Sequence, residues 1–364
     1  MEHHHHLYFD NNATTPLRPE AVSAMQFAMG PPANPSSVHS YGRAARMIVE
    51  EARGEIAMLA GCRGVDLVFT SGGTEANNLA LSMFDTIITS AVEHDSVIQA
   101  APNAKPIPVD SKGRVDLAAL GEILANLDDA ARSRTLVSVM TANNETGVIQ
   151  PIDEIVALAK AAGVAVHSDM VQALGKQHLD FGGSGLDFAS LSAHKIGGPS
   201  GIGALLVRPG QAMTSLLRGG GQEQGRRPGT ENVIGIAGFG GAAKAAFDDI
   251  KHYRAMSGWR DRLEDKLLSQ RNDAVLFGAG ADRLGNTSCL AIGERTSETM
   301  VMALDLAGVA VSAGAACSSG KVHESHVLKA MSIGVHAGCA IRISGGWSSG
   351  EADFERLAEV LVAL

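Results

Sequence analysis

The sequence predicts an α/β protein whose large domain holds a mostly parallel, seven-stranded sheet and whose smaller domain is of the α+β class. Three observations support this prediction. Between about residues 67 and 207, short apolar runs alternate with helical patterns, which is typical of a parallel sheet covered by helices on both faces. A second set of helices and strands follows. The chain has 364 residues, which is long enough to bury a large core and to divide into two domains.

The strands of the large sheet are expected at short apolar runs. These runs are 67–70, 87–90, 106–109, 136–140, 164–167, 188–191 and 204–207. Helices are expected between several of them, notably at 117–127 and 152–162. The last strand follows a short Gly-rich turn, which allows it to run antiparallel to its neighbours.

The second set of elements begins with a long helix expected at 232–253. The elements expected after it are a helix at 259–271, strands at 274–277 and 288–292, a helix at 298–307, a strand at 310–312 and a closing helix at 352–364. Helices on one face of a small sheet indicate an α+β unit. We therefore predict a large domain over 15–250 and a small domain made of 7–14 and 251–364.

Charge and composition exclude several classes of function. The net charge of −9 argues against nucleic acid or an anionic membrane as the main partner. No apolar run approaches the ~20 residues that a membrane-spanning helix needs. No signal-peptide pattern is present, so a cytoplasmic protein is expected. The histidines at 3–6 are typical of an expression tag, and no metal site is assigned to them.

The four cysteines form no C-x-x-C pair, so neither a zinc site nor a disulfide framework is expected. Cys62, Cys289 and Cys339 lie in or beside apolar segments, where cysteine behaves as a small buried hydrophobic residue. Cys317 lies instead in a run of Gly, Ala and Ser that has little to pack. A cysteine in such a loop is better explained by reactivity than by structure.

Lys195 ends the apolar run 188–191 and is followed by a Gly-rich turn that cannot continue a regular element. An ammonium at the end of a buried strand is poorly solvated, and this lowers its pKa. Such an amine is a good carbonyl nucleophile, as a Schiff base with pyridoxal 5'-phosphate requires. Taken alone, Lys195 is equally consistent with a solvated loop lysine.

Two further segments favour the cofactor. Asp169 ends another buried strand, and an aspartate at this place can keep the pyridine nitrogen of pyridoxal phosphate protonated. After strand 67–70, Gly72, Gly73 and Thr74 open a helix, where backbone N–H groups and a hydroxyl can bind a phosphate. Open α/β sheets bind their ligands at the carboxyl ends of their strands. The sequence therefore predicts a pyridoxal-phosphate site at this edge.

The chain resembles the cysteine desulfurases, which are pyridoxal-phosphate enzymes of the class V aminotransferase group, and most closely the NifS-like type. The motifs that carry the resemblance are YFDNNATTP (8–16), NPSS (34–37), TSGGTE (70–75), VEH (92–94), ANNETG (142–147), SAHK (192–195), RRPGTEN (226–232) and ACSS (316–319). The resemblance implies the fold of type I pyridoxal-phosphate transferases. It also implies a homodimer with its active sites at the subunit interface.

The resemblance assigns a role to each matching position. Lys195 would bind the cofactor and move the α-proton, Asp169 would hold the ring nitrogen, and Gln172 would hydrogen-bond the ring's phenolic oxygen. His94 would stack on the ring and Asn144 would lie near the phenolic oxygen or the substrate carboxylate; the residues alone equally permit a structural histidine and a turn-forming asparagine. The residues expected to hold the phosphate are Gly73, Thr74, Ser192 and His194, with Thr230 from the partner subunit.

The substrate implied by the resemblance is L-cysteine. Arg342 lies in a strand pattern and would bind the substrate carboxylate with its guanidinium fork. The Cys317 thiolate would take the sulfur as a persulfide and release L-alanine. The sulfur would pass to an acceptor or scaffold protein for iron–sulfur cluster assembly. A selenocysteine lyase and a weakly active, cofactor-binding sulfur-relay protein are the alternatives.

One position departs from the family pattern. Relatives usually have alanine after the aspartate that holds the ring, and that alanine packs on the ring face opposite the histidine. Here the position is Met170, a longer side chain that could crowd the cofactor or point away from it.

Overall fold

The computed structural model describes residues 6–30, 32, 34–314 and 324–364. Its largest element is a seven-stranded sheet whose strand order is β2-β8-β7-β6-β5-β3-β4. The strands are β2 (Leu67–Thr70), β3 (Thr86–Ser90), β4 (Lys105–Ile107), β5 (Thr135–Ser138), β6 (Ala165–Asp169), β7 (Phe188–Ser192) and β8 (Gly203–Val207). All seven lie at the predicted places. β8 runs antiparallel to both of its neighbours, as the short Gly-rich turn allowed, and the other pairs are parallel.

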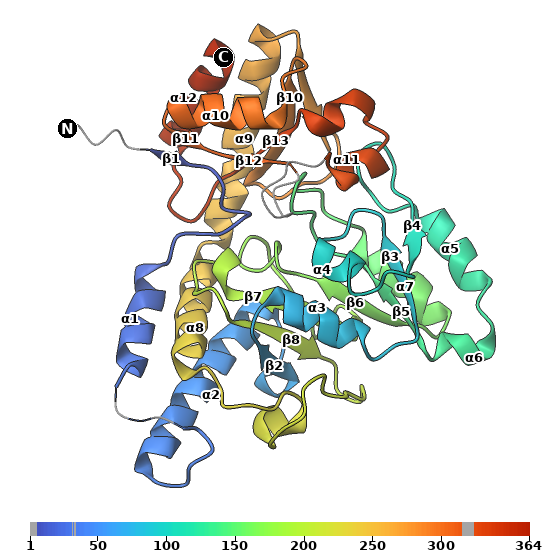
Figure 1. The fold of residues 1–364 in the computed structure, drawn as a ribbon, viewed down its shortest axis with the longest axis vertical. Helices are drawn as coiled ribbons and strands as arrows, with labels where there is room; N and C mark the ends of the chain where they lie inside the picture. Colours follow the sequence, from blue (N-terminus) through green and yellow to red (C-terminus); the bar gives the residue numbers. More distant parts are fainter. Residues whose placement is uncertain (1–5, 31, 33, 315–323) are drawn as a thin grey trace.

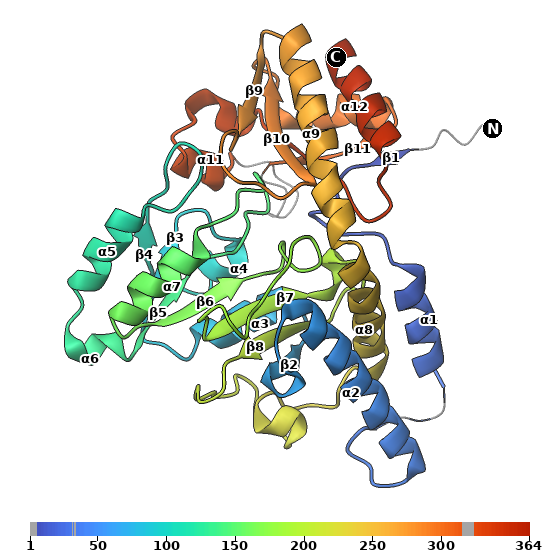
Figure 2. The same ribbon diagram turned by 180° about the vertical axis from the view of Figure 1, so that it is seen from behind.

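Helices cover both faces of this sheet (Figures 1 and 2). One face packs on apolar side chains of α1 (Pro19–Ala28), α2 (Ser40–Ala60), α5 (Leu117–Ala125), α7 (Ile152–Ala161) and α8 (Val233–Asp248). The other face packs on α3 (Gly73–Leu81) and α4 (Asp95–Ile98). The short helix α6 (Asp129–Arg132) precedes β5. The central strands are therefore buried on both sides, which is why they read as continuous apolar runs.

A second, antiparallel sheet has the order β12-β13-β10-β9. Its strands are β9 (Ala274–Phe277), β10 (Thr287–Ile292), β12 (Ser312–Ala313) and β13 (Ile341–Ser344). One face packs on α9 (Ile250–Gln270), α10 (Ser297–Leu306) and α12 (Glu351–Ala363). The other face meets α11 (His326–Ala330). Each sheet thus has its own core, and the domain boundaries themselves stay a prediction.

Two predicted elements were wrong in detail. The predicted strand 310–312 is two short strands on either side of Val311: β11 (Val309–Ala310) pairs with β1 (Leu7–Tyr8), whereas β12 pairs with β13. The helix predicted at 232–253 ends at Asp248, and the next helix, α9, begins at Ile250 and runs without interruption through residues 254–258, where a gap between helices was predicted. The break lies at Asp249, whose carboxylate forms an ion pair with Arg18 at 2.6 Å. A contact 231 residues distant in sequence cannot be read from local periodicity.

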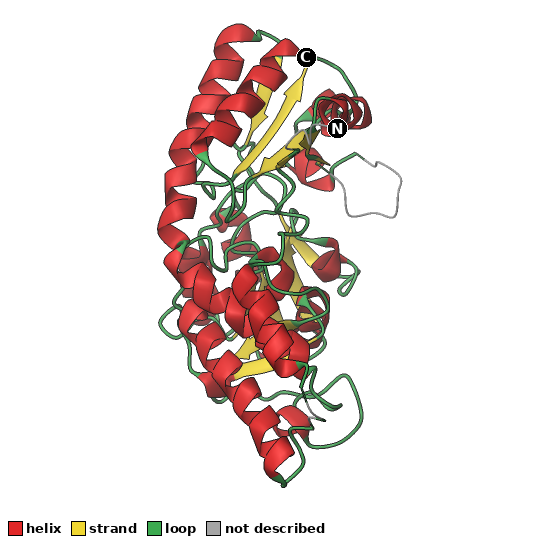
Figure 3. Ribbon diagram, turned by 90° about the vertical axis from the view of Figure 1, so that its left-hand side faces the viewer, coloured by secondary structure: helices red, strands yellow, loops and turns green. Residues whose placement is uncertain are grey.

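α8 and α9 follow one another along the long axis of the molecule and join the two sheets on one side (Figure 3). The segment after β1 also connects the two sheets. Asp10 forms a β-bridge with Ser344 of β13 in the small sheet, and the Thr15 N–H donates to the carbonyl of His194, which follows β7 of the large sheet. Within the described ranges, no helix is long and apolar enough to cross a membrane.

Candidate active site

A cavity of about 300 Å³ lies at the edge of the large sheet, where β6 and β7 end. Among the predicted site residues whose positions the structure describes, all but Thr230 line it. These residues are Gly73, Thr74, His94, Asn144, Asp169, Gln172, Ser192, His194, Lys195 and Arg342. The structure thus brings together side chains that lie up to 269 residues apart in the sequence. Strand ends of the large sheet supply most of them, and β13 of the small sheet supplies Arg342.

Lys195 lies in a short 3₁₀ turn, Ala193–Lys195, that follows β7 directly. Its side chain is half-buried, and its Nζ atom donates to the carbonyl oxygens of Asn12 at 2.5 Å and Ala13 at 2.8 Å. Carbonyl oxygens can stabilise an amine in either protonation state. The geometry therefore holds a primary amine at the cavity wall, where it can reach a bound carbonyl compound.

Asp169 is the last residue of β6 and is buried. One carboxylate oxygen accepts from the side-chain amide of Asn77 at 2.8 Å, and the other accepts from the backbone N–H of Val171 at 2.9 Å. These two donors fix the carboxylate beside the cavity. Asn77 lies one turn after Gly73 on α3, so both residues face the same edge of the sheet. An anion held in this way can keep a ring nitrogen protonated.

His94 is linked to Asp169 by a chain of hydrogen bonds. The second N–H of the Asn77 amide donates to Ser96 Oγ at 2.8 Å, and Ser96 Oγ lies 2.8 Å from His94 Nδ1. The backbone N–H of Ser96 also donates to His94 Nδ1, at 3.1 Å. Because Nδ1 accepts here, a neutral His94 carries its proton on Nε2. The same contact makes His94 the N-cap of α4, so His94 has a structural role as well as a place in the cavity wall.

The start of α3 provides a place in the cavity wall where an anion can bind. Gly72 has a φ of 155°, which side chains rarely allow, and a Cβ on Gly73 would lie 2.9 Å from Val171 Cγ2. No side chain caps α3, so its first backbone N–H groups remain available at Gly73 and Thr74. Ser192 adds a hydroxyl.

His194 adds an imidazole to the lining of the cavity. Burial is the main reason why its pKa is lowered to about 4, and the positive charges of Lys195 and Lys176 contribute to this lowering. His194 is therefore neutral near pH 7 in this environment. A neutral imidazole still donates one N–H to an anion.

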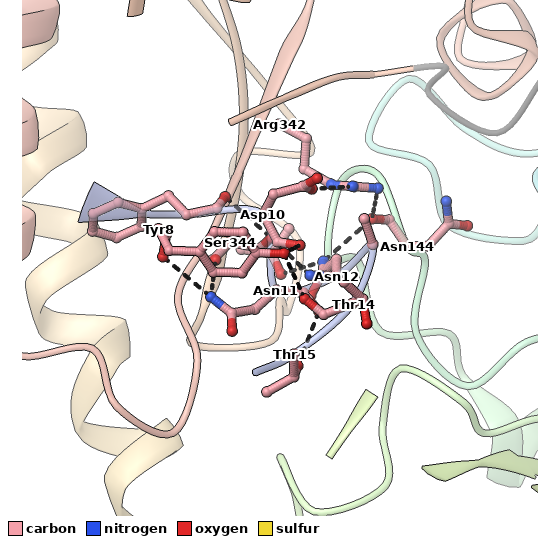
Figure 4. A network of polar contacts seen from close by, with 12 residues as sticks. Tyr8, Asp10, Asn11, Asn12, Thr14, Thr15, Asn144, Arg342 and Ser344 are labelled. Carbon is pink, nitrogen blue, oxygen red and sulfur yellow. Dashed lines mark hydrogen bonds and ion pairs between the residues drawn. The ribbon is translucent and has the colours of Figure 1, made fainter. Parts of the chain in front are cut away.

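Arg342 is buried to 2% exposure on β13 (Figure 4). Its Nη2 atom forms an ion pair with Asp10 at 2.7 Å, and its Nη1 atom donates to the backbone carbonyl of Asn144 at 3.2 Å. Its Nε atom is buried and has no hydrogen-bond partner among the residues that the structure describes. A buried N–H without an acceptor is costly, so the guanidinium retains capacity for one more acceptor. A carboxylate bound in the cavity would supply it.

Gln172 and Lys176 lie one turn apart after β6 and contact the N-terminal segment. Gln172 Nε2 donates to the Asn12 carbonyl at 3.0 Å. Lys176 Nζ donates to Gln172 Oε1 at 2.8 Å and to Asn12 Oδ1 at 2.9 Å. No role was predicted for Asn12, although it lies in the motif at 8–16, because its contacts join the two sheets and cannot be read from local sequence. No role was predicted for Asn77, Ser96 or Val171 either. Each lies a few residues after a predicted site residue (Gly73, His94 and Asp169, respectively), and this spacing could have identified them.

The Met170 side chain points away from the candidate site. Met170 is buried in the core of the large sheet and lines a different cavity, whereas Val171 lines the candidate site. Side chains alternate at the end of a strand, so Asp169 and Val171 face one side and Met170 faces the other. Thr230 is exposed and lines a separate, smaller cavity beside Arg227. Cys317 lies outside the described residues.

The other cysteines have the environment of structural residues. Cys289 and Cys339 are buried, and Cys62 is half-buried. Burial raises the pKa of Cys62 to about 12 and raises the pKa of Cys289 and Cys339 as well. Thiols with raised pKa values are poor nucleophiles near pH 7. Among the residues with described positions, no cluster of three or more His, Cys, Asp or Glu side chains could hold a metal ion.

The donor set of the cavity fits pyridoxal phosphate. The amine of Lys195 matches an aldehyde, the carboxylate of Asp169 matches a protonated ring nitrogen, and the open N-terminus of α3 matches a phosphate. The close approach of Gly73 to Val171 leaves no room for a side chain at that point of the wall.

Comparison with known proteins agrees with this arrangement. The family model "Aminotransferase class-V" matches residues 7–357. The chain is similar to the cysteine desulfurase of Cereibacter sphaeroides, with 42% identity over 373 residues, covering 98% of this chain and 94% of the relative. It is also similar in structure to a NifS-like protein from Rickettsia africae ESF-5, with a TM-score of 0.91 and 37% identity over 99% of this chain and 100% of the other.

SspA, solved in complex with cysteine, has a TM-score of 0.76 and 26% identity, covering 93% of this chain and 98% of its own. The family match spans nearly the whole chain, and the cavity holds the amine, the carboxylate and the anion site expected of such a protein. The chain therefore belongs to the class-V aminotransferase family and, within it, to the cysteine desulfurases.

Proposed function

We propose that this protein binds pyridoxal 5'-phosphate in the cavity at the ends of β6 and β7 and removes sulfur from L-cysteine, releasing L-alanine. The observation that carries the proposal is the convergence of Lys195, Asp169 and Arg342 on one cavity of about 300 Å³. When bound, the cofactor supplies an electron sink for the α-carbon of the substrate. The remaining roles follow from the positions of the chain's own residues.

Four groups of contacts would hold the cofactor. Asp169 keeps a proton on the ring nitrogen, because its carboxylate is fixed by Asn77 and by the N–H of Val171. Gln172 donates to the phenolic oxygen, and His94 lies against the ring face. The phosphate is bound at the start of α3, where the contributing residues are Gly73, Thr74, Ser192 and His194.

The substrate would be oriented by its carboxylate. Arg342 has a buried Nε–H that lacks an acceptor, and Asn144 lines the cavity beside it. With the carboxylate fixed there, the amine of Lys195 can take the α-proton. The Asn12 and Ala13 carbonyls, which already hold this amine, would stabilise it when it becomes protonated.

Cys317 would receive the sulfur. Its thiolate attacks the sulfur of the substrate, the carbon–sulfur bond breaks with its electron pair on carbon, and a proton completes alanine. The enzyme thiol and the transferred sulfur form a persulfide, so atoms and electrons balance. We infer that an acceptor or scaffold protein then takes this sulfur for iron–sulfur cluster assembly, and only the family resemblance supports this last step.

A homodimer would complete the site. Large apolar side chains are exposed between α1 and the middle of α2: Phe27 (78%), Met29 (61%), Val38 (88%), Tyr41 (55%) and Met47 (62%). Such a concentration on one segment favours burial against a second copy. Thr230 is exposed and lies outside the cavity of its own chain, which supports a role at the partner's phosphate site.

The test is a product assay. Purified protein loaded with pyridoxal phosphate is given L-cysteine, and alanine and sulfane sulfur are quantified together. We expect equal amounts of both products, no turnover in Lys195→Ala, and no persulfide on Cys317→Ala by mass spectrometry. Lys244→Ala is the matched control, because this lysine is exposed on α8. Undiminished alanine release by Lys195→Ala would overturn the proposal.

A further inference from the structure

Lys176 is a buried amine next to the cavity that the proposed reaction does not use. The residue is 5% exposed. Its Nζ atom contacts two neutral amide oxygens, Gln172 Oε1 and Asn12 Oδ1, at 2.8 and 2.9 Å. No carboxylate of the described chain lies within ion-pair distance of it. An amine with this environment is costly to bury, and it calls for a specific role.

The charges around Lys176 add to that cost. Burial is the main reason why its pKa lies well below the usual value, and the positive charges of Lys195 and Arg342 lower the pKa further. His194 is the other ionisable group of the site whose charge is coupled to Lys176.

The contacts of Lys176 determine which way the Gln172 amide faces. An amide has an acceptor end and a donor end that are nearly equal in shape, so its orientation depends on its neighbours. At Gln172, Lys176 donates to Oε1, whereas the Asn12 carbonyl accepts from Nε2 at 3.0 Å. Turning the amide by 180° would place the NH₂ group against an amine and the oxygen against a carbonyl. Both contacts would be lost.

The Asn12 side chain is oriented in the same way. Its Oδ1 accepts from Lys176 and from Asn286 at 3.2 Å, while its Nδ2 donates to the Asn144 carbonyl at 3.2 Å and to Thr287 Oγ1 at 2.9 Å. Lys176 therefore supports both the Gln172 amide and Asn12, whose backbone carbonyl accepts from the Gln172 amide and from the Lys195 amine.

We propose that Lys176 is a positioning residue, which fixes the Gln172 amide so that its second Nε2–H faces the cavity and donates to the phenolic oxygen of the bound cofactor. This inference rests on the proposed function only in requiring the cofactor to bind in this cavity. It adds to the site a residue that does not line the cavity, because Lys176 acts through Gln172.

The experiment is a double-mutant cycle with Lys176→Met and Gln172→Ala. The first readout is cofactor affinity, measured by fluorescence titration of the cofactor-free protein, and the second is the pH at which the absorbance of the bound cofactor changes. Each single variant should weaken cofactor binding by roughly tenfold, because each removes or misplaces the one buried hydrogen bond from Gln172 to the cofactor. Each should also move the absorbance transition in the same direction.

Non-additivity distinguishes positioning from simple stabilisation. If Lys176 acts through Gln172, Lys176→Met produces little further change in the Gln172→Ala background. Fully additive effects on affinity and absorbance would overturn the inference. Lys176→Gln retains an N–H donor and is expected to recover part of the affinity, and thermal melting of each cofactor-free variant shows whether it is folded. Lys244→Met is the matched control on an exposed lysine.

The same series separates the two proposals. If wild-type protein does not bind the cofactor, or if borohydride reduction fails to attach it to Lys195, the proposed function fails. If wild-type protein binds and is reduced at Lys195 but the cycle is additive, only the role of Lys176 fails.

Discussion

Replacement of Glu93 by glutamine is expected to remove a pH dependence of folding stability. Glu93 follows β3 and is fully buried. Its Oε1 accepts from Ser90 Oγ at 2.5 Å and from the Met140 N–H at 2.8 Å, whereas its Oε2 is buried and has no partner among the described residues. Burial and, to a smaller extent, the charge of Asp169 raise the pKa of this carboxyl from 4.5 to about 8, against the opposing effect of its two hydrogen bonds.

The sign of the effect follows from proton binding in the two states. Below pH 4.5 the folded and unfolded chains both hold the proton on Glu93. Between pH 4.5 and about 8 the unfolded chain loses this proton and the folded chain keeps it, so stability falls as the pH rises. Each pKa unit is worth about 1.4 kcal/mol, so the loss from Glu93 between pH 5 and pH 8 is roughly 4 kcal/mol.

The assay is the free energy of unfolding from denaturant titrations at several pH values, at one fixed cofactor concentration. Glu93→Gln should lack this loss, so its stability relative to wild type should improve steadily from pH 5 to pH 8. Glu122→Gln, on the exposed surface of α5, is the matched control. A constant stability difference between Glu93→Gln and wild type across this range would refute the reasoning.

Three other results are expected. Met170→Ala should lower the free energy of unfolding by about 2 to 4 kcal/mol while leaving the absorbance of the bound cofactor unchanged, since the side chain lies in the core and away from the site; an altered spectrum would contradict this placement. Arg342→Lys should raise the KM for cysteine by roughly tenfold or more with little effect on cofactor absorbance, because one ammonium cannot replace the planar guanidinium that contacts Asp10 and Asn144 while its Nε–H faces a further acceptor; an unchanged KM in steady-state kinetics would contradict it. Arg283→Met should cost about 3 to 5 kcal/mol in denaturant titrations, because it leaves the Glu264 carboxylate buried and unpaired, and Glu264→Gln added to it should recover part of the loss.

The site residues that directly follow a strand could be predicted from the sequence. Lys195 and Asp169 each follow an apolar run, and Gly73 and Thr74 begin a helix directly after a strand. Parallel strands bring such ends to one edge, so local patterns were sufficient to place these residues together. The antiparallel direction of β8 was also readable, because a short turn cannot cross back over the sheet.

Contacts between the two sheets could not be predicted in this way. Arg342 was expected to bind a carboxylate, but its ion pair with Asp10 joins residues 332 positions apart. The break between α8 and α9 depends on Arg18, and the split of the predicted strand 310–312 depends on which neighbour each half pairs with. Hydrophobic periodicity reports which face of an element is buried. It does not report the partner that covers that face.

The N-terminal segment shows why these long-range contacts matter for the site. Asn12 accepts from Lys195 and Gln172 with its carbonyl and from Lys176 with its side chain, all on the large-sheet side. The same side chain donates to Thr287 on β10 of the small sheet, and Asp10 holds Arg342 on β13. The amine that would act on the α-carbon and the guanidinium that would bind the carboxylate are therefore positioned against one short stretch of backbone. Their relative positions therefore depend on residues 10–12 as well as on the two sheets, so this segment would determine whether one amino-acid substrate contacts both side chains at once.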